Sequence, residues 1–354
     1  LRNYERHERV SVVMVERSLE GVASFVRDLG SACSAVQLVG DMLLAGSHDG
    51  LLLCLDAASG GERWRLQVDG PVSDLALDGE RIYATASASL HAVDAAGGEL
   101  LWSRELEGAS DYVQAWDGVV WATSSVYELE VADFVEATAW RFDASGDEQE
   151  RWVFSERPWH VGLHADGGIL LGLGRPRCGY LRIQPGQKPE HFELDNESPV
   201  ACGACGVAGR FLFGHADGTI SSIGSVEGSE NPSESLVTAL ASSDSGWVSG
   251  HDDGTIATSD STVTAPGSID AVASLGPIAW ASSWNGSTPT LTILQFGTIS
   301  IDARVRQMHS SKNSLVLGDD LGRVFLIESE VVSRRLSDNE ETTPEDFRNS
   351  ELRA

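Results

Sequence analysis

The sequence predicts an all-β protein, a β-propeller of four-stranded antiparallel blades, with eight blades preferred and seven as the alternative. One stretch recurs as GHADGTI at residues 214–220 and GHDDGTI at 250–256, with a related GSHDGLL at 46–52. Between such turns lie short runs rich in Val, Leu, Ile and Trp, which are typical of strands. Radial repetition of four-stranded units builds a propeller.

Each repeat has the same internal order of strands. VSDLALDGE at 72–80 is followed by RIYATAS at 81–87, LHAVD at 90–94 and a run that ends in Trp102. Because Asp-Gly accepts the positive φ of a two-residue hairpin turn, the recurring stretch is predicted to join the second and third strands of a repeat.

Two spacings set the length of the repeat. Turn glycines return after 36 residues, from Gly218 to Gly254 and again from Gly286 to Gly322. An interval near forty residues fits one blade of four strands.

A tryptophan ends the fourth strand of several repeats, at Trp64, Trp102 and Trp152. The first two are 38 residues apart and the next two are 50 apart. We attribute the excess to an acidic insertion near residues 126–136, and we expect all three tryptophans to pack between blades.

The first two strands of a repeat can be identified eight times, which gives the preferred count of blades. Ring closure combines strands from both termini in one blade. SFVRDLG at 24–30 is expected to complete the blade that contains VFLIES at 324–329, and VVSRRLS at 331–337 is an alternative for the same position.

The predicted organisation has three parts. Residues 1–30 form an N-terminal segment that includes a ring-closing strand, 31–336 form the propeller, and 337–354 form a polar, acidic tail that is predicted to be disordered. A weak helical pattern occurs only at 19–29.

The composition is strongly acidic, with 53 Asp and Glu against 25 Lys and Arg and a net charge of −28. Such a field repels phosphate groups, so nucleic-acid binding and anionic-membrane binding are not expected. Lys188 and Lys312 are the only lysines. This balance predicts a salt-adapted organism, a halophilic archaeon, with an acidic protein of a GC-rich genome as the alternative.

The location is predicted to be cytoplasmic. Five cysteines are scattered through the chain, and an odd number does not form a disulfide framework. No apolar run approaches the ~18 residues of a membrane span. The chain begins at Leu1 without an apolar signal core, and a trimmed secretion signal is the alternative.

GSHDGLLLCLDAASGGERW and ATASASLHAVDAAGGELLW resemble the repeats of pyrroloquinoline-quinone-type propellers, most clearly over residues 36–102. WVSGHDDGTIATSD is similar to a WD-repeat hairpin but lacks the closing Trp-Asp. The resemblance implies a propeller. Its cofactor-using members hold the quinone between a tryptophan and an adjacent Cys-Cys disulfide, with calcium; this sequence has no adjacent cysteine pair, so no cofactor is expected.

Cys202 and Cys205 form a CGAC motif, which can be half of a zinc site or a redox pair. Only Cys178 or a distant histidine could complete a metal site. Cys178, Cys202 and Cys205 are therefore weak candidates for metal ligands, and a structural role is preferred for them. The histidines His48, His215 and His251 recur in hairpins, where they are expected to satisfy turn backbone.

The innermost strands offer little acid–base chemistry, and no catalytic set is predicted. The residues expected to face the central channel are Ser73, Asp74, Tyr112, His160, Thr238 and Gln307.

Arginine is concentrated in one repeat of this acidic chain, together with a tryptophan. Because Arg and Trp are enriched at interaction hot spots, these residues are the candidate contact patch for a protein partner, against local salt bridging as the alternative. The candidates are Arg157, Trp159, Arg175, Arg177 and Arg182, with Arg151 nearby. The acidic insertion at 127–136 is a second candidate.

The predicted function is that of a non-catalytic, monomeric platform for protein partners. The alternative is a propeller enzyme that binds a quinone or another small ligand, an oxidoreductase.

Overall fold

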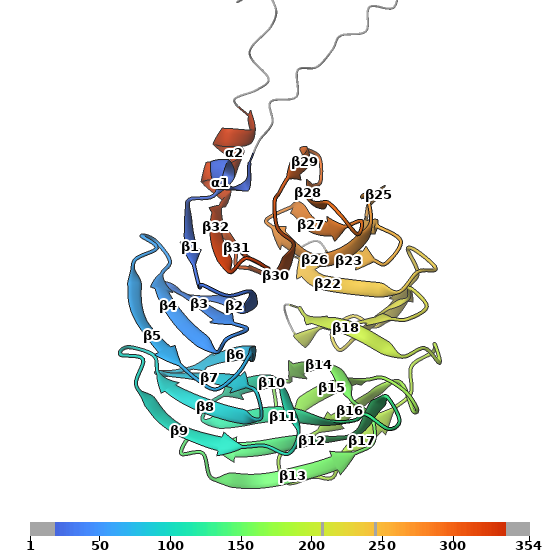
Figure 1. Cartoon of the computed structure of the whole chain (residues 1–354). Helices are drawn as coiled ribbons and strands as arrows, with labels where there is room; N and C mark the ends of the chain where they lie inside the picture. The colour runs from blue at the N-terminus through green and yellow to red at the C-terminus, as the bar shows by residue number, and fades with distance from the viewer. Residues whose placement is uncertain (1–17, 207–208, 244–245, 338–354) are drawn as a thin grey trace, which may run out of the picture.

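The computed structural model describes residues 18–206, 209–243 and 246–337, and the strands in these ranges form eight separate sheets. Every sheet has four strands, and each strand is antiparallel to its neighbour. The sheets stand around a central axis as the blades of a propeller (Figure 1). The predicted fold class and the preferred count of eight blades are confirmed.

The strands of each blade run in sequence order from the innermost to the outermost, except at ring closure. Blades 1 to 4 contain β2 (Cys33–Val39), β3 (Met42–Ser47), β4 (Leu51–Asp56) and β5 (Glu62–Gln67); β6 (Val72–Asp78), β7 (Arg81–Ala86), β8 (Ser89–Asp94) and β9 (Leu100–Glu105); β10 (Ala109–Trp116), β11 (Val119–Glu128), β12 (Asp133–Asp143) and β13 (Glu148–Phe154); β14 (Pro158–Leu163), β15 (Ile169–Leu173), β16 (Tyr180–Ile183) and β17 (Glu190–Phe192). Blades 5 to 8 contain β18 (Val200–Cys205), β19 (Phe211–His215), β20 (Ile220–Ile223) and β21 (Gly228–Glu230); β22 (Val237–Ser243), β23 (Gly246–His251), β24 (Thr255–Thr258) and β25 (Thr262–Thr264); β26 (Ser268–Leu275), β27 (Ile278–Trp284), β28 (Pro289–Ile293) and β29 (Gly297–Ser300); β30 (Val305–Ser310), β31 (Ser314–Asp319), β32 (Arg323–Glu328) and β1 (Phe25–Asp28).

The innermost strands form a closed ring, because each lies beside the next and β30 lies beside β2. All eight carry a shift of register close to their first residue. A β-bulge bends its strand and changes the direction of a side chain. Every blade therefore has a redirected side chain near the start of its innermost strand, at one end of the ring. The bulged positions are Ser34, Ser73, Asp111 with Tyr112, Trp159, Ala201, Thr238, Asp270 and Arg306.

We call this end of the ring the upper face. In an antiparallel blade it also carries the turns between the second and third strands, such as 48–50 in blade 1 and 216–219 in blade 5. The opposite, lower face carries the turns between the first and second strands.

The first glycine of the recurring stretch lets neighbouring blades approach closely. A Cβ atom on Gly214 would lie 2.5 Å from Cγ1 of Val237 in the next blade, and one on Gly250 would lie 2.2 Å from Cγ2 of Ile269. Gly46 meets the first strand of blade 2 in the same way. The repeat therefore keeps glycine here because a branched side chain of the next blade fills the space.

The histidines of two recurring stretches are buried in the hairpins. Nδ1 of His215 donates to the carbonyl oxygen of Ser198, 3.1 Å away, and Nε2 lies 2.9 Å from the Ser221 hydroxyl. His251 bonds through Nδ1 to the carbonyl oxygen of Ser235 at 2.9 Å. The prediction that these histidines satisfy turn backbone is confirmed.

His48 differs from His215 and His251 because its side chain is exposed. Ser47 occupies the equivalent buried position, and its hydroxyl accepts a hydrogen bond from the backbone N–H of Leu51 at 3.0 Å. A shift of one residue along a strand moves a side chain to the other face, so grouping His48 with the buried pair was wrong.

All three repeat tryptophans pack between blades, and two of them also form a hydrogen bond to the next blade. Nε1 of Trp64 donates to the carbonyl oxygen of Ala95 at 2.9 Å, and Nε1 of Trp102 donates to that of Ala144 at 3.0 Å, each in the following blade. Trp152 packs against a core that blade 3 shares with Val161 and Ile169 of blade 4, and it stacks on Trp121 with ring centroids 5.7 Å apart. Trp152 makes no equivalent bond among the described residues, and Nε1 of Trp121 donates to the carbonyl oxygen of Gly167 in blade 4 at 2.9 Å.

Ring closure uses the N-terminal strand. β1 pairs with β32, with Phe25 opposite Leu326, and becomes the outermost strand of blade 8. Nε of Arg27 donates to the carbonyl oxygen of Gly60 at 2.6 Å, as Arg104 does to that of Gly146 between blades 2 and 3. β1 therefore repeats the contacts of an ordinary outermost strand. Residues 338–354 of the predicted tail and residues 1–17 lie outside the described residues, and Ser337, the first residue of that tail, ends a helix.

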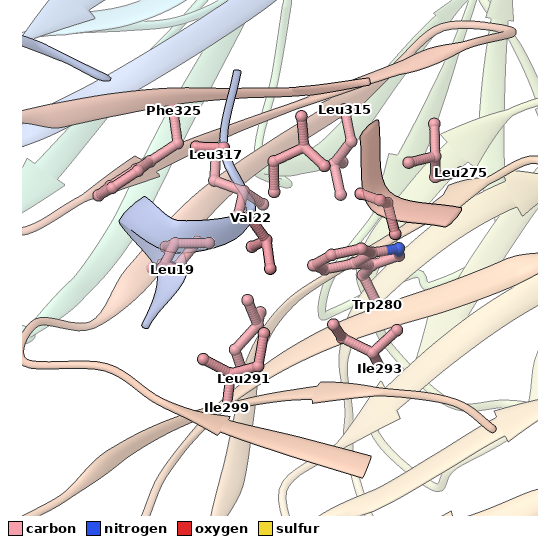
Figure 2. Close-up of a cluster of buried hydrophobic side chains, with 14 of the residues drawn as sticks. Leu19, Val22, Leu275, Trp280, Leu291, Ile293, Ile299, Leu315, Leu317 and Phe325 are labelled. Carbon is pink, nitrogen blue, oxygen red and sulfur yellow. The ribbon is translucent and has the colours of Figure 1, made fainter. Parts of the chain in front are cut away.

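Two helices pack together beside the closing strand, α1 (Leu19–Val22) and α2 (Ser329–Ser337). The 331–337 segment, the alternative closing strand, is thus helical. Nη1 of Arg335 donates to the carbonyl oxygens of Gly21 and Ala23 at 2.9 and 3.0 Å. Leu19 and Val22 enter a core with Trp280 of blade 7 and Phe325 of blade 8 (Figure 2). Residues 19–28 therefore belong to the packed body, inside the segment predicted to precede the propeller.

Candidate functional site

The second hairpin of blade 3 projects beyond the rest of its sheet. β11 and β12 have ten and eleven residues, whereas β10 reaches only to Ser125 of β11 and β13 reaches only to Ala137 of β12. Residues 126–136 therefore form a two-stranded ribbon on the upper face. This ribbon is the predicted acidic insertion.

The tip of the ribbon exposes large apolar side chains. Leu129 is 87% exposed and Val131 is 58% exposed, while Tyr127 and Val135 are 47% and 36% exposed. Apolar side chains scattered singly on a surface are normal, whereas here four lie within nine residues on one projecting element.

The base of the ribbon is held by Arg157 from the start of blade 4. Its guanidinium carbon lies 4.1 Å from the ring centre of Phe134 in the ribbon and 4.5 Å from that of Trp159. Nη2 also donates to Oδ1 of Asp111 at 2.6 Å. One guanidinium is thus enclosed by two rings and a carboxylate, an arrangement that favours arginine over lysine.

Asp111 is buried at the bulge of β10 and is the anchor for Arg157. Burial raises the pKa of the Asp111 carboxyl, against the hydrogen bonds from the Ser125 hydroxyl and from Arg157, which lower it. The Tyr112 hydroxyl donates to the carbonyl oxygen of Trp159 at 2.9 Å and ties the same two blades together. Nε of Arg157 is buried and has no hydrogen-bond partner in the described chain.

The loop between β15 and β16 adds two arginines beside Trp159. Arg177 binds the buried carboxylate of Glu156 through Nε and Nη2 at 2.7 and 2.6 Å. Burial raises the pKa of Glu156, but the Arg177 guanidinium outweighs it and the net pKa is lowered. Arg175 is exposed and forms no ion pair among the residues that the structure describes.

These parts lie on one surface. A Cβ on Gly174 would lie 2.8 Å from Nε1 of Trp159, which places the β15–β16 loop against that indole. We call the surface the ribbon face and define it as Arg157, Trp159, Arg175 and Arg177 together with residues 127–136. The two partner-contact candidates predicted from the sequence are thus adjacent.

Arg182 does not belong to the ribbon face. It pairs with Asp166, which lies in the turn between β14 and β15 at the lower face. Arg151 pairs with Glu107 at 3.1 Å on the outermost strand of blade 3. For these two arginines, local salt bridging is the role that the contacts support.

The predicted channel residues do not converge on one group. Ser73 is exposed at the bulge of β6, Thr238 donates to the carbonyl oxygen of Gly250 at 3.1 Å, and Gln307 is half-buried on β30. His309, which the sequence analysis did not select, accepts the backbone N–H of Leu38 through Nδ1 at 3.1 Å and links blades 8 and 1.

Three of the predicted channel residues, Asp74, Tyr112 and His160, have displaced pKa values, and burial raises the pKa of the Tyr112 hydroxyl. Burial raises the pKa of Asp74 to about 7, against hydrogen bonds from the N–H groups of Val113 and Leu75, which lower it. Burial lowers the pKa of His160 to about 4. Nε2 of His160 lies 3.7 Å from Sγ of Cys205.

The three candidate metal cysteines are not brought together. Cys202 and Cys205 are three residues apart on β18, so their side chains leave opposite faces of the strand. Sγ of Cys202 lies 3.5 Å from the carbonyl oxygen of Val237 in the next blade, and burial raises its pKa to about 12. Cys178 lies in the β15–β16 loop of blade 4. Within the described residues, no three His, Cys, Asp or Glu side chains form a group that could hold a metal.

The comparisons with known proteins agree with the repeat pattern. The PQQ_2 family model, described as outer membrane protein assembly factor BamB, matches residues 17–115 and 54–174. The chain is a β-propeller, and its residues 17–174 contain repeats similar to those of the PQQ_2 model. No curated protein matches this propeller.

Solved structures share the fold of this propeller at low identity. The yeast Saccharomyces cerevisiae Sqt1 has a TM-score of 0.68 and 11% identity, covering 87% of this chain and 98% of its own. The computationally designed Ika8 protein has a TM-score of 0.62 and 17% identity, covering 85% and 98%. The Cps50 (Swd1) β-propeller domain of Myceliophteria thermophila has a TM-score of 0.59 and 12% identity, covering 86% and 98%. Across the described ranges, no helix is long and apolar enough to cross a membrane.

Proposed function

We propose that this propeller is a non-catalytic platform that binds another protein through the ribbon face. The observation that carries the proposal is the projecting ribbon, whose tip holds Leu129 and Val131 at 87% and 58% exposure. Large apolar side chains in water cost free energy that a partner surface can recover by covering them.

The base of the ribbon supports the same role. Arg157 fixes Phe134 against Trp159 through contacts of 4.1 and 4.5 Å, so the apolar tip is presented from an ordered base. A surface that is ordered before binding loses less conformational entropy when the complex forms. The matched family model is named for an assembly factor, which also favours a role in protein assembly.

The test is quantitative affinity capture from an extract of the organism that makes the protein, in concentrated salt. The ribbon variant carries Leu129→Ser, Val131→Ser and Trp159→Ala. The matched control variant carries Leu100→Ser, Leu101→Ser and Trp116→Ala, which are 48%, 46% and 46% exposed and lie outside the ribbon face, on β9 of blade 2 and at the end of β10 in blade 3.

We expect the wild type and the control variant to retain one protein at a one-to-one ratio that the ribbon variant loses. Capture of the same proteins by all three, or by none, would overturn the platform. Arg175→Ala gives a milder test, because this arginine forms no ion pair in the described chain and its loss leaves folding unchanged. Weaker capture by Arg175→Ala would assign it a direct contact.

A further inference from the structure

The ribbon has an edge that none of the described strands covers. β13 ends opposite Ala137, so within the described part of the chain residues 133–136 of β12 have a strand neighbour only on the β11 side. β10 likewise ends opposite Ser125, which leaves Tyr127 and Glu128 without a neighbour on the inner side. An uncovered edge presents backbone N–H and C=O groups to an added strand.

The charge of the ribbon selects against a second copy of itself. Glu128, Glu130 and Asp133 are exposed carboxylates, and no Lys or Arg lies between residues 127 and 140. Like charges placed opposite each other on paired strands are destabilising, so two ribbons repel. A strand that carries Lys or Arg would instead meet opposite charge along the same edge.

Every other long outer edge of the propeller differs in this respect. The outermost strands β1, β5, β9 and β13 carry Arg27, Arg63, Arg104 and Arg151. These strands also carry Asp or Glu, so their edges present mixed charge, and Arg63, Arg104 and Arg151 are paired with carboxylates. The outermost strands β17, β21, β25 and β29 have three or four residues and carry no run of carboxylates. Among the described strands, the ribbon therefore combines an open edge, exposed apolar side chains and unbalanced negative charge.

From this combination, and on the basis of the proposed platform, we infer that the part of the partner that lies along the open edge of residues 127–136 is an extended basic segment, while Arg175 contacts another part of the same protein. The segment adds as a strand to the open edge of β12. Its backbone pairs with residues 133–136, its Lys or Arg side chains meet Glu128, Glu130 and Asp133, and its alternate apolar side chains cover Leu129 and Val131. Strand addition gives affinity through the backbone and specificity through alternate side chains.

The experiment measures fluorescence anisotropy of labelled octapeptides with the full chain. The basic peptide alternates valine with lysine or arginine, and the acidic peptide alternates valine with glutamate. A third peptide has the basic side chains but is N-methylated at every residue, so it has no N–H to donate. The buffer contains salt at about 1 M, where the Debye length is ~3 Å and attraction to the overall negative charge is screened.

We expect the basic peptide to bind and the acidic and N-methylated peptides to bind at least about tenfold more weakly. The charge-reversed ribbon, Glu128→Lys, Glu130→Lys and Asp133→Lys, should prefer the acidic peptide. The matched control reverses Asp69, Glu99 and Glu105, which are exposed on blades 1 and 2, and should keep the wild-type preference. Amide hydrogen exchange should slow at residues 133–136 on adding the basic peptide.

Equal binding of the basic and N-methylated peptides would overturn strand addition, and so would a concentration-dependent dimer of the free chain that pairs through the ribbon. No binding of any peptide would also overturn it. These failures are separate from failure of the platform, which depends on whether the wild type captures a protein that the Leu129→Ser, Val131→Ser, Trp159→Ala variant loses.

Discussion

Blades 3 and 6 hold equivalent places in the ring, but they differ in what their second hairpin presents to solvent. In blade 6, β23 and β24 have six and four residues, and the turn is closed around the buried side chain of His251. In blade 3, β11 and β12 have ten and eleven residues, and the turn carries Leu129 at 87% exposure.

The difference separates two uses of residues in one fold. What repeats from blade to blade, such as Gly214 and Gly250, is explained by packing against the next blade. What departs from the repeat, the ribbon and the arginine that holds it, lies on the surface and has no packing purpose at its tip. Departures from the repeat are therefore where function is to be sought in this propeller.

The largest contrast is expected between two tryptophans, one that packs between blades and one on the ribbon face. Trp64→Ala removes a buried indole and its hydrogen bond to Ala95, and should lower the free energy of unfolding by about 4 kcal/mol. Trp159→Ala removes a 38% exposed indole that stacks on Arg157, and should cost about 1 kcal/mol while abolishing capture of the partner. Urea unfolding in concentrated salt, followed by capture with the folded variants, measures both effects.

If Trp159→Ala destabilised the chain as much as Trp64→Ala, the ribbon face would be part of the core and the comparison would fail. Trp116→Ala, 46% exposed on blade 3 and outside the ribbon face, is the control and should change neither quantity.

Two turn glycines test whether the repeat is set by the neighbouring blade. Gly218 and Gly286 both have positive φ, +87° and +95°, but a Cβ would lie 1.7 Å from the carbonyl oxygen of Ser233 at Gly218 and would meet open space at Gly286. Gly286→Ala should cost about 1 kcal/mol for the left-handed backbone, and Gly218→Ala about 3 kcal/mol because the added atom also clashes. Equal costs, measured by urea unfolding, would mean that the backbone conformation alone requires glycine at this turn.

Much of the fold could be predicted because the evidence for it is local in sequence. Eight hairpins, the Asp-Gly turns and the positions of Trp64 and Trp102 follow from patterns within about forty residues. Repetition then fixes the order of the blades around the ring without knowledge of any contact between them.

The site was less predictable because its contacts join residues far apart. Asp111 and Arg157 are 46 residues apart, and the stacking of Arg157 on Phe134 follows from no spacing rule. Arg177 and Arg182 belong to the same arginine-rich stretch of sequence, but they lie at opposite faces. Successive turns of an antiparallel blade alternate between faces, and Arg177 lies in the β15–β16 turn whereas Arg182 pairs with Asp166 in the β14–β15 turn. The cytoplasmic location and the salt-adapted source remain predictions from composition.

The channel offers a test by pH that separates packing from chemistry. His160 has its pKa lowered by burial from 6.5 to about 4, so between these values the unfolded chain binds a proton that the native chain does not. Stability from this residue is present above pH 6.5 and is lost as the pH falls toward 4, by about 2–3 kcal/mol. His160→Gln should therefore remove this acid-side loss.

The measurement is urea unfolding of the wild type and His160→Gln from pH 4 to 7.5, with the exposed His48→Gln as the control. Asp74 acts in the opposite direction, because its raised pKa of about 7 makes its contribution fall as the pH rises from about 4 to 7. In the His160→Gln variant, the free energy of unfolding should therefore fall as the pH rises from about 4 to 7. Parallel profiles of wild type and variant would mean that His160 is solvated in the native chain and that the channel is open to water at this blade.

The smallest effects concern two arginines of blade 4 that the sequence placed in one cluster. Arg182 pairs with Asp166 at the lower face, and the two side chains are 33% and 29% exposed, so Arg182→Ala should cost at most about 0.5 kcal/mol and leave capture unchanged. Arg175→Ala should not change the free energy of unfolding but should weaken capture, because Arg175 lies on the ribbon face with no ion pair among the described residues. Loss of capture in Arg182→Ala but not in Arg175→Ala would place the partner on the lower face. It would also contradict the argument that the ribbon of blade 3, the largest departure from the repeat, carries the function.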